Sequence, residues 1–170
     1  MQRETGIALM RRSLDILENQ KPEMADRYMQ IPLDYYSDPE LAARERLLFE
    51  TQPLALIAAS EIGNAYDFIV RDAVGRSILL TRDGDGQAHA FLNYCRHRGA
   101  EPASGCGNRR AFSCPYHGWS YDAKGKLIGL PLRDRYEGLE LSRLGLVELP
   151  SEERHGFIWV VLTPDAPIDV

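Results

Sequence analysis

The sequence predicts a mainly β protein, an antiparallel sandwich or small barrel, preceded by an N-terminal helical arm. Three observations lead to this class. After Thr51 the chain consists of short, strand-like apolar runs at close spacing. Turns rich in Asp and Gly separate several of these runs. Before Thr51 the apolar residues instead recur at intervals of three and four, as on one face of a helix. Many short strands of this kind are typical of antiparallel sandwiches and barrels.

The arm comprises residues 1–50 and is predicted to contain two helices. The first covers residues 7–18, whose apolar face consists of Ile7, Met10, Leu14 and Leu17. The second is expected to begin near Ser37, because Ser37 and Glu40 have the spacing of a capping box and Pro39 suits a first helical turn. The sequence leaves open whether the arm docks on another domain or subunit or packs on its own sheet.

The β domain is predicted to span residues 51–165, and residues 166–170 are read as the start of a linker to a further domain. Its expected strands are residues 54–59, 67–72, 76–82, 87–94, 110–114, 118–122, 126–130, 143–149 and 156–163. The segments Asp83–Gly86 and Asp122–Gly125 are predicted hairpin turns.

Composition narrows the class of protein. A net charge of −5 gives no reason to expect nucleic acid or an anionic membrane as a partner. No stretch approaches the roughly 20 apolar residues of a membrane span, and residues 1–21 lack the apolar run of a signal peptide, so a cytoplasmic location is predicted. Three cysteines in a cytoplasmic chain favour metal ligands or free thiols over a disulfide framework.

Two short clusters carry the chemistry. Cys95 and His97 belong to the first, Cys-Arg-His-Arg-Gly, and Cys114 and His117 belong to the second, Cys-Pro-Tyr-His-Gly-Trp. Each cluster supplies one thiolate and one imidazole, which predicts a [2Fe–2S] cluster with two cysteines on one iron and two histidines on the other. Such a cluster carries less negative charge than an all-cysteine one and is easier to reduce. The cysteines are expected to hold the inner iron, and the histidines the outer iron near solvent.

A zinc site is the alternative, since zinc also binds two cysteines and two histidines. Zinc fingers usually pair Cys with Cys and His with His within each half, whereas both halves are mixed here. The pattern therefore favours the iron–sulfur cluster.

Residues around the ligands are assigned to the cluster environment. Gly99 and Gly118 each follow a histidine, where a loop must bend tightly and where backbone N–H groups can donate to the sulfides. Pro115 is expected to stiffen the second loop. The positive charges of Arg96 and Arg98 either favour reduction of the cluster and dock an acidic ferredoxin, or are simply solvated.

Other side chains near the clusters are weighed against ordinary structural roles. Tyr116 and Trp119 either cover the cluster or belong to the core, and Tyr121 is assigned to the core. Cys106 is predicted to be a free loop thiol. His89 is predicted to be a surface or cross-strand residue rather than a ligand.

The segments 93–100 and 114–122 resemble the Rieske domain of aromatic-ring-hydroxylating oxygenases, in the N-terminal half of the alpha subunit. The resemblance is specific there and looser over residues 35–164. It implies a Rieske-type antiparallel β-sandwich with two cluster-binding loops. It also implies a ferredoxin or flavin reductase as electron donor, and a mononuclear non-heme iron in a catalytic domain as acceptor. The full-length family forms trimers, so a homotrimer is implied as well.

Two departures from related proteins matter. Respiratory Rieske proteins carry an extra cysteine in each loop, forming a disulfide, where this chain has Gly99 and Tyr116; they also place a serine near the cluster, where this chain has Trp119. Fewer donors to the sulfurs predict a reduction potential near the lower end of the Rieske range, about −150 mV.

The second departure concerns the catalytic iron, which needs two histidines and a carboxylate. Only His89 and His155 remain beyond the cluster ligands. The chain is therefore expected to be unable to hydroxylate alone, as a fragment, a split subunit or a short natural relative. The predicted function is one-electron transfer as the electron-delivering domain of a ring-hydroxylating oxygenase. A free-standing Rieske ferredoxin and a zinc-stabilised interaction module are the alternatives, and the substrate is not predicted.

Overall fold

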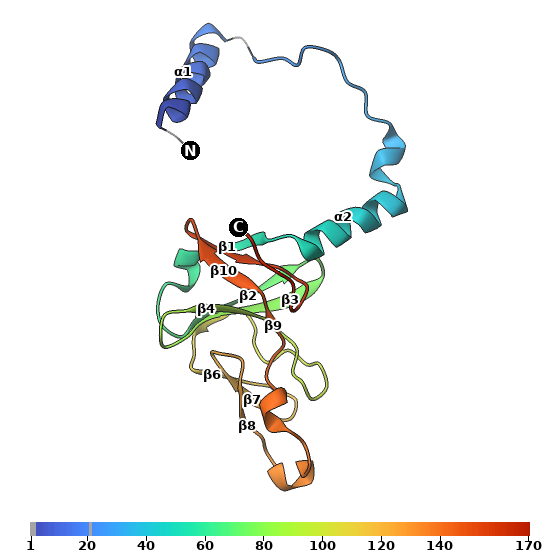
Figure 1. Cartoon of the computed structure of the whole chain (residues 1–170), viewed down its shortest axis with the longest axis vertical. Helices are drawn as coiled ribbons and strands as arrows, with labels where there is room; N and C mark the ends of the chain where they lie inside the picture. Colours follow the sequence, from blue (N-terminus) through green and yellow to red (C-terminus); the bar gives the residue numbers. More distant parts are fainter. Residues whose placement is uncertain (1–2, 21) are drawn as a thin grey trace. The chain divides into compact units, whose positions relative to one another are not determined.

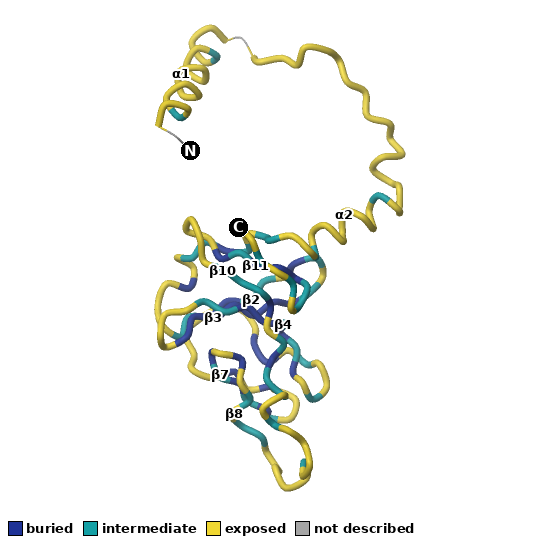
Figure 2. The backbone as a smooth tube through the Cα atoms, in the orientation of Figure 1, coloured by how far each residue is buried: buried dark blue, intermediate teal, exposed yellow. Residues whose placement is uncertain are grey.

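The structure, a computed structural model, describes residues 3–20 and 22–170, which fall into two compact units divided between Asp38 and Pro39 (Figure 1). The first unit holds α1 (Arg3–Asn19) and the short 3-10 helix η1 (Leu33–Tyr36). The helix predicted over 7–18 is confirmed and begins four residues earlier. No residue of α1 is buried, so its apolar face is not covered by its own unit (Figure 2).

The second unit begins with α2 (Pro39–Thr51). Since its first residue is Pro39, the N-cap position falls on Asp38 and not on the predicted Ser37, whose hydroxyl instead donates to the carbonyl of Asp34. The end of α2 is fastened to the sheets by Glu50. Its carboxylate lies 3.0 Å from Arg76, and its carbonyl accepts the hydroxyl of Thr163 at 2.9 Å. The domain boundaries predicted at residues 50 and 165 stay predictions.

Eleven strands in the described residues form three antiparallel sheets. The first sheet has the order β1 (Leu54–Ala58), β11 (Phe157–Val160), β10 (Ser151–Arg154). The second has the order β5 (Cys106–Asn108), β2 (Asp67–Ala73), β3 (Arg76–Arg82), β4 (Ala88–Leu92), β9 (Glu148–Leu149). The third has the order β6 (Ala111–Ser113), β7 (Ser120–Asp122), β8 (Leu127–Gly129). Short 3-10 helices follow β1 (η2, Ala59–Ile62) and β8 (η3, Arg133–Tyr136; η4, Leu141–Arg143). The predicted mainly β, antiparallel fold is confirmed.

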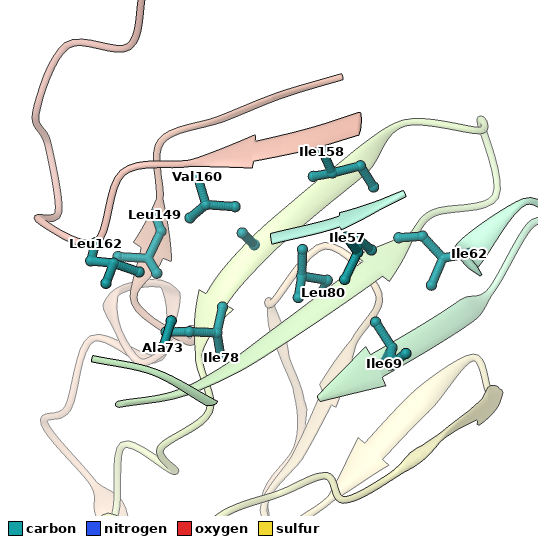
Figure 3. Close-up of a cluster of buried hydrophobic side chains, with 11 residues drawn as sticks. Ile57, Ile62, Ile69, Ala73, Ile78, Leu80, Leu149, Ile158, Val160 and Leu162 are labelled. Atoms are coloured by element: carbon teal, nitrogen blue, oxygen red, sulfur yellow. The ribbon is translucent and has the colours of Figure 1, made fainter. Parts of the chain in front are cut away.

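The five-stranded sheet is the middle layer, because its strands bury both faces. Ile69, Ile78 and Leu80 point into a core shared with the first sheet, which Figure 3 shows. Phe68 and Leu79 point the other way, into a second core shared with the third sheet and the cysteine loops. Successive residues of a strand alternate between faces, so a strand between two cores is buried on both. This explains why six consecutive residues of β3 are buried.

Most predicted strands are present, but three parts of the pattern were wrong. β5 and β10 were not predicted, because β5 contains Gly107 in an exposed edge strand and β10 reads Ser-Glu-Glu-Arg, without apolar alternation. The strand predicted over 143–149 is reduced to Glu148–Leu149, since the 3-10 helix η4 ends at residue 143 and residues 144–147 are irregular.

Both predicted hairpin turns are confirmed, and they share one construction. The Oδ1 atom of Asp83 accepts the backbone N–H groups of Asp85 and Gln87, both at 2.9 Å. The Oδ1 atom of Asp122 accepts those of Lys124 and Lys126 at the same distance. Each aspartate thereby closes the turn that begins with it.

Across the described residues, no helix has the length and apolar character needed to cross a bilayer.

Candidate metal centre

The two loops that carry the predicted ligands are built alike. In the first, the N–H of Cys95 donates to the carbonyl of Ala100, and the N–H of Gly99 donates back to the carbonyl of Cys95, both at 2.8 Å. In the second, the N–H of Cys114 donates to the carbonyl of Trp119 at 2.8 Å, and the N–H of Gly118 donates to the carbonyl of Cys114 at 2.9 Å. The glycines have φ of 73° and 74°, in the left-handed region that favours glycine. The predicted tight bends are thus present at both positions.

The third sheet and β4 place these loops next to each other. β4 runs towards Cys95, and the β6–β7 hairpin carries the second loop between its strands. Asn93 ties the base of the first loop together, because its side chain, fully buried, donates to the carbonyl of Ala103 and accepts the N–H of the same residue. Both loops therefore project from packed strands.

The two cysteines lie inside the second core. Cys95 and Cys114 are each 4% exposed, and neither forms a disulfide. The hydroxyl of Tyr121 lies 3.2 Å from Sγ of Cys95 and accepts the backbone N–H of Arg96 at 3.0 Å. Burial, with the added influence of Cys95, raises the pKa of Tyr121 above its ordinary value, so the hydroxyl keeps its proton. It can therefore donate to the sulfur.

The two histidines meet nearer the surface. The rings of His97 and His117 are 4.6 Å apart between centroids, inclined at 64°. The Nδ1 atom of His97 is buried without a hydrogen-bond partner in the described residues, as expected of an atom whose partner is a metal. Burial, then the neighbouring His117 and Arg98, lower the pKa of His97 and favour the neutral imidazole that metals bind. The residues present thus fit a cluster with buried thiolates and outer imidazoles.

Aromatic side chains surround the histidines unequally. Trp119 is buried and stacks on His97, with centroids 5.0 Å apart and planes within 6°. Tyr116 lies against His117 at 4.0 Å but is 60% exposed, so it covers one face of that ring without closing the site. Tyr136, which was not predicted, stands edge-on to both His97 and Trp119.

The remaining predicted site residues lie on the outside of the loops. Arg96, Arg98 and Pro115 are exposed. Cys106 is a free, exposed thiol on β5, outside the site, and His89 lies on β4 with Nε2 at 3.0 Å from Asp83. Within residues 3–20 and 22–170, no three or more His, Cys, Asp or Glu side chains are grouped so as to hold a single ion. The structure instead separates the predicted ligands into an inner cysteine pair and an outer histidine pair.

The sequence analysis did not identify Tyr121 as a donor to sulfur, although the alternation of residues along β7 could have indicated that its side chain faces the cysteines. Tyr121 alternates with Ser120 and Asp122, so it faces the core in which Cys95 lies. Tyr136 gave no comparable signal, because it lies in a 3-10 helix far from the ligands along the chain.

Residues 52–148 match the family model described as the Rieske [2Fe–2S] domain. The chain belongs to the Rieske [2Fe–2S] domain family. The cofactor of this domain is the [2Fe–2S] cluster, and the predicted recognition is confirmed.

Relatives of this Rieske domain include the alpha and large subunits of known enzymes. It is 38% identical over 112 residues to an N,N-dimethyl phenylurea N-demethylase alpha subunit from Sphingobium sp. (strain YBL2), covering 64% of this chain and 24% of the relative. It is 33% identical to the anthranilate 1,2-dioxygenase large subunit of Acinetobacter baylyi, covering 83% of this chain and 31% of that subunit.

Solved structures agree with this relationship. The apo form of the quaternary ammonium Rieske monooxygenase CntA matches with a TM-score of 0.75 and 28% identity, over 81% of this chain and 41% of that one. Naphthalene 1,2-dioxygenase from Rhodococcus sp. matches with a TM-score of 0.70 and 34% identity, over 77% and 31%. The chain thus spans well under half the length of these relatives.

Proposed function

We propose that Cys95, His97, Cys114 and His117 hold the [2Fe–2S] cluster and that the chain serves as the electron-delivering domain of a Rieske oxygenase terminal component. The observation that carries this proposal is the sorting of the four side chains. The thiols are buried in one core, while the imidazoles meet ring to ring outside it, with Nδ1 of His97 lacking any partner in the described structure. The chemistry supplied by the bound cluster is the uptake and release of one electron.

The protein's own residues have distinct parts in this function. The twin loops hold two ligands each, and their glycines allow the turns. Tyr121 donates a hydrogen bond to Cys95 and so favours the more negative, reduced state. Trp119 keeps water from one face of His97. His117 is the exposed ligand, and its ring edge is the place where an electron can pass to or from a partner.

The relatives support the proposed partners. The structural and sequence relatives are oxygenase subunits of which this chain spans a minor part, which supports an oxygenase domain or subunit with a mononuclear iron as acceptor. A ferredoxin or flavin reductase is the corresponding donor. The cytoplasmic location and the homotrimer of the full-length protein are part of the same proposal. A free-standing Rieske ferredoxin is the alternative function, and the contacts described at the metal centre are compatible with both.

The cluster assignment is tested on the purified chain, prepared without oxygen. Iron, acid-labile sulfide and zinc are measured, together with the EPR spectrum after dithionite reduction. We expect two irons and two sulfides per chain and the EPR signal of a reduced Rieske centre. Zinc without sulfide would overturn the proposal in favour of a zinc-stabilised module.

Two observations distinguish an oxygenase domain from a free-standing carrier: the reading frame beyond the codon of Val170, and the ability of the isolated chain to reduce a separate oxygenase. A reading frame that continues into a site with two histidines and one carboxylate supports the oxygenase. A stop codon directly after Val170, together with reduction of a separate oxygenase by the isolated chain, would instead establish the free-standing carrier.

A further inference from the structure

A loop that the predicted site did not include lies against the metal centre. Residues 131–144 run from β8 through the 3-10 helices η3 and η4. Every residue of 131–140 is exposed except Tyr136. The loop first touches the site at Pro131, whose Cγ lies 3.2 Å from the position that a Cβ on Gly118 would occupy. It therefore begins in contact with the residue that follows the ligand His117.

Tyr136 makes the second contact, with the other ligand loop. Its ring centroid is 6.2 Å from that of His97 at an interplanar angle of 89°, and 5.5 Å from that of Trp119 at 83°. Both are edge-to-face arrangements, which aromatic rings favour. One side chain thus touches a ligand from the first loop and a stacking partner from the second.

The two histidine ligands are consequently held to different degrees. His97 has three ring neighbours, namely His117, Trp119 and Tyr136, and is partly buried. His117 is exposed and has His97 and the largely exposed Tyr116. The difference between them is made by Trp119 and by the 131–144 loop.

We propose that Tyr136 is a positioning residue for His97, so that the 131–144 loop sets the orientation of this ligand and shields it from water. This inference rests on the proposed function of His97 as a ligand. An imidazole can turn about its Cβ–Cγ bond. Trp119, stacked flat on one face of the ring, opposes that rotation but allows the imidazole to slide parallel to the indole plane. The ring of Tyr136 stands across that plane and opposes the sliding.

The backbone of the loop supports this role. Leu132 has φ 56° and ψ 44°, a left-handed conformation that is unfavourable for leucine. It lies between Pro131 and Tyr136, and its side chain is 58% exposed. Such a conformation persists where contacts on both sides impose it. Here those contacts are made to Gly118 on one side and to His97 and Trp119 on the other.

The sign of the effect on reduction follows from charge. With two thiolates and two neutral imidazoles the oxidised centre is formally neutral and the reduced one is singly negative. Water admitted beside His97 stabilises the charged state more than the neutral one. Removing the Tyr136 ring should therefore favour reduction, and freeing the imidazole should broaden the spread of EPR g values.

The test uses the chain with its cluster and four variants: Tyr136→Phe, Tyr136→Leu, Tyr136→Ala and Leu139→Ala. The midpoint potential, the EPR g values of the reduced form and the rate of iron loss to a chelator are measured. We expect Tyr136→Ala to favour reduction by about threefold, equivalent to about 30 mV for one electron. We also expect it to broaden the g values and to speed iron loss by about threefold.

The other variants separate positioning from folding. Tyr136→Phe keeps the ring and should match the wild type in all three measurements. Tyr136→Leu keeps apolar bulk, so it remains informative if the alanine variant does not fold, and it should shift the g values. Leu139→Ala removes an exposed apolar side chain from the same loop and leaves the Tyr136 ring in place, so it should change nothing.

Wild-type g values and potential in Tyr136→Leu, and in Tyr136→Ala where that variant folds, would overturn the inference. The same shifts in Leu139→Ala would also overturn it, because they would come from the loop as a whole. A wild-type chain without iron and sulfide would instead contradict the proposed function, and that result is seen before any variant is made.

Discussion

The hydroxyl of Tyr121 lies 3.2 Å from Sγ of Cys95 while it accepts the backbone N–H of Arg96 at 3.0 Å. The strand β7 thereby reaches across the core and fastens the first ligand loop at two neighbouring residues. A hydroxyl that receives one N–H and keeps its own proton has that proton free for the thiolate.

We expect Tyr121→Phe to retain the cluster and to lower its midpoint potential by about 30 to 60 mV, which corresponds to a three- to tenfold change in the reduction equilibrium. The reason is that a hydrogen bond to a ligating sulfur stabilises the reduced, more negative state. Redox titration monitored by visible absorption measures the change.

Tyr94→Phe is the matched control for this prediction. The hydroxyl of Tyr94 accepts the backbone N–H of Ser77 on β3 at 3.1 Å, a contact with the backbone and not with a ligand sulfur. Both variants should lose about 1 kcal/mol of folding stability, but only Tyr121→Phe should move the potential. Equal potentials in Tyr121→Phe and wild type would show that the contact with Cys95 does not influence reduction.

The potential of the wild-type chain is predicted to lie near the lower end of the Rieske range, about −150 mV. The sequence comparison with respiratory Rieske proteins leads us to expect fewer donors to the sulfurs, because Trp119 offers no hydroxyl there, and Tyr121 remains as a donor to Cys95. A titration against mediators of known potential provides the measurement. A strongly positive midpoint would contradict the prediction.

Each proposed ligand should be indispensable for the cluster. We expect near-complete loss of iron, sulfide and visible colour in four single variants: Cys95→Ser, His97→Ala, Cys114→Ser and His117→Ala. Cys106→Ser is the control, because this exposed thiol lies on β5 outside the site and its loss should leave iron and sulfide unchanged. Full iron and sulfide in any one of the four variants would remove that residue from the ligand set.

The two loop glycines should differ in their tolerance of alanine. Both have a left-handed backbone, which costs an alanine about 1–2 kcal/mol. At Gly99 nothing lies within 4 Å of the added methyl group, whereas at Gly118 it would meet Pro131 at 3.2 Å. Gly118→Ala should therefore lose more stability and release iron faster than Gly99→Ala, as measured by urea unfolding and by chelator challenge. The reverse order would show that Pro131 yields to the methyl group without cost.

Asp83 should make the fold sensitive to acid. Its side chain is 2% exposed, and this burial alone would raise its pKa. Hydrogen bonds from His89, from the backbone N–H groups of Gln87 and Asp85, and from Lys124 together hold the pKa well below the ordinary value. A carboxyl with a lowered pKa binds fewer protons when folded, so its stabilising effect is complete above about pH 4 and is lost as the pH falls below that value.

The variant Asp83→Asn keeps an oxygen for the turn but loses the charge. We expect it to be about 1–3 kcal/mol less stable near neutral pH and to show a weaker further decline between about pH 4 and about pH 2. Urea unfolding at several pH values measures both effects. Asp85→Asn, at a carboxylate that is 75% exposed, should behave like the wild type. An unchanged acid response in Asp83→Asn would place the acid sensitivity elsewhere.

The chemistry of the site could be predicted from the sequence because it depends on residue type and short spacing. Cys95 and His97, like Cys114 and His117, are close along the chain, so their pairing needed no knowledge of long-range contacts. The glycine turns and the Asp83 and Asp122 hairpins were equally local. Strands with apolar runs, such as β3, were visible for the same reason.

Only the tertiary structure decided how the pieces meet. The polar β10 and the exposed β5 become strands through pairing with β11 and β2, which their own residues do not signal. Tyr121 becomes a donor to Cys95 across 26 positions of sequence, and Tyr136 reaches His97 from a loop that is otherwise exposed. Ligand identity is a property of the side chain itself, whereas support of a ligand depends on which distant side chains the packed layers bring beside it.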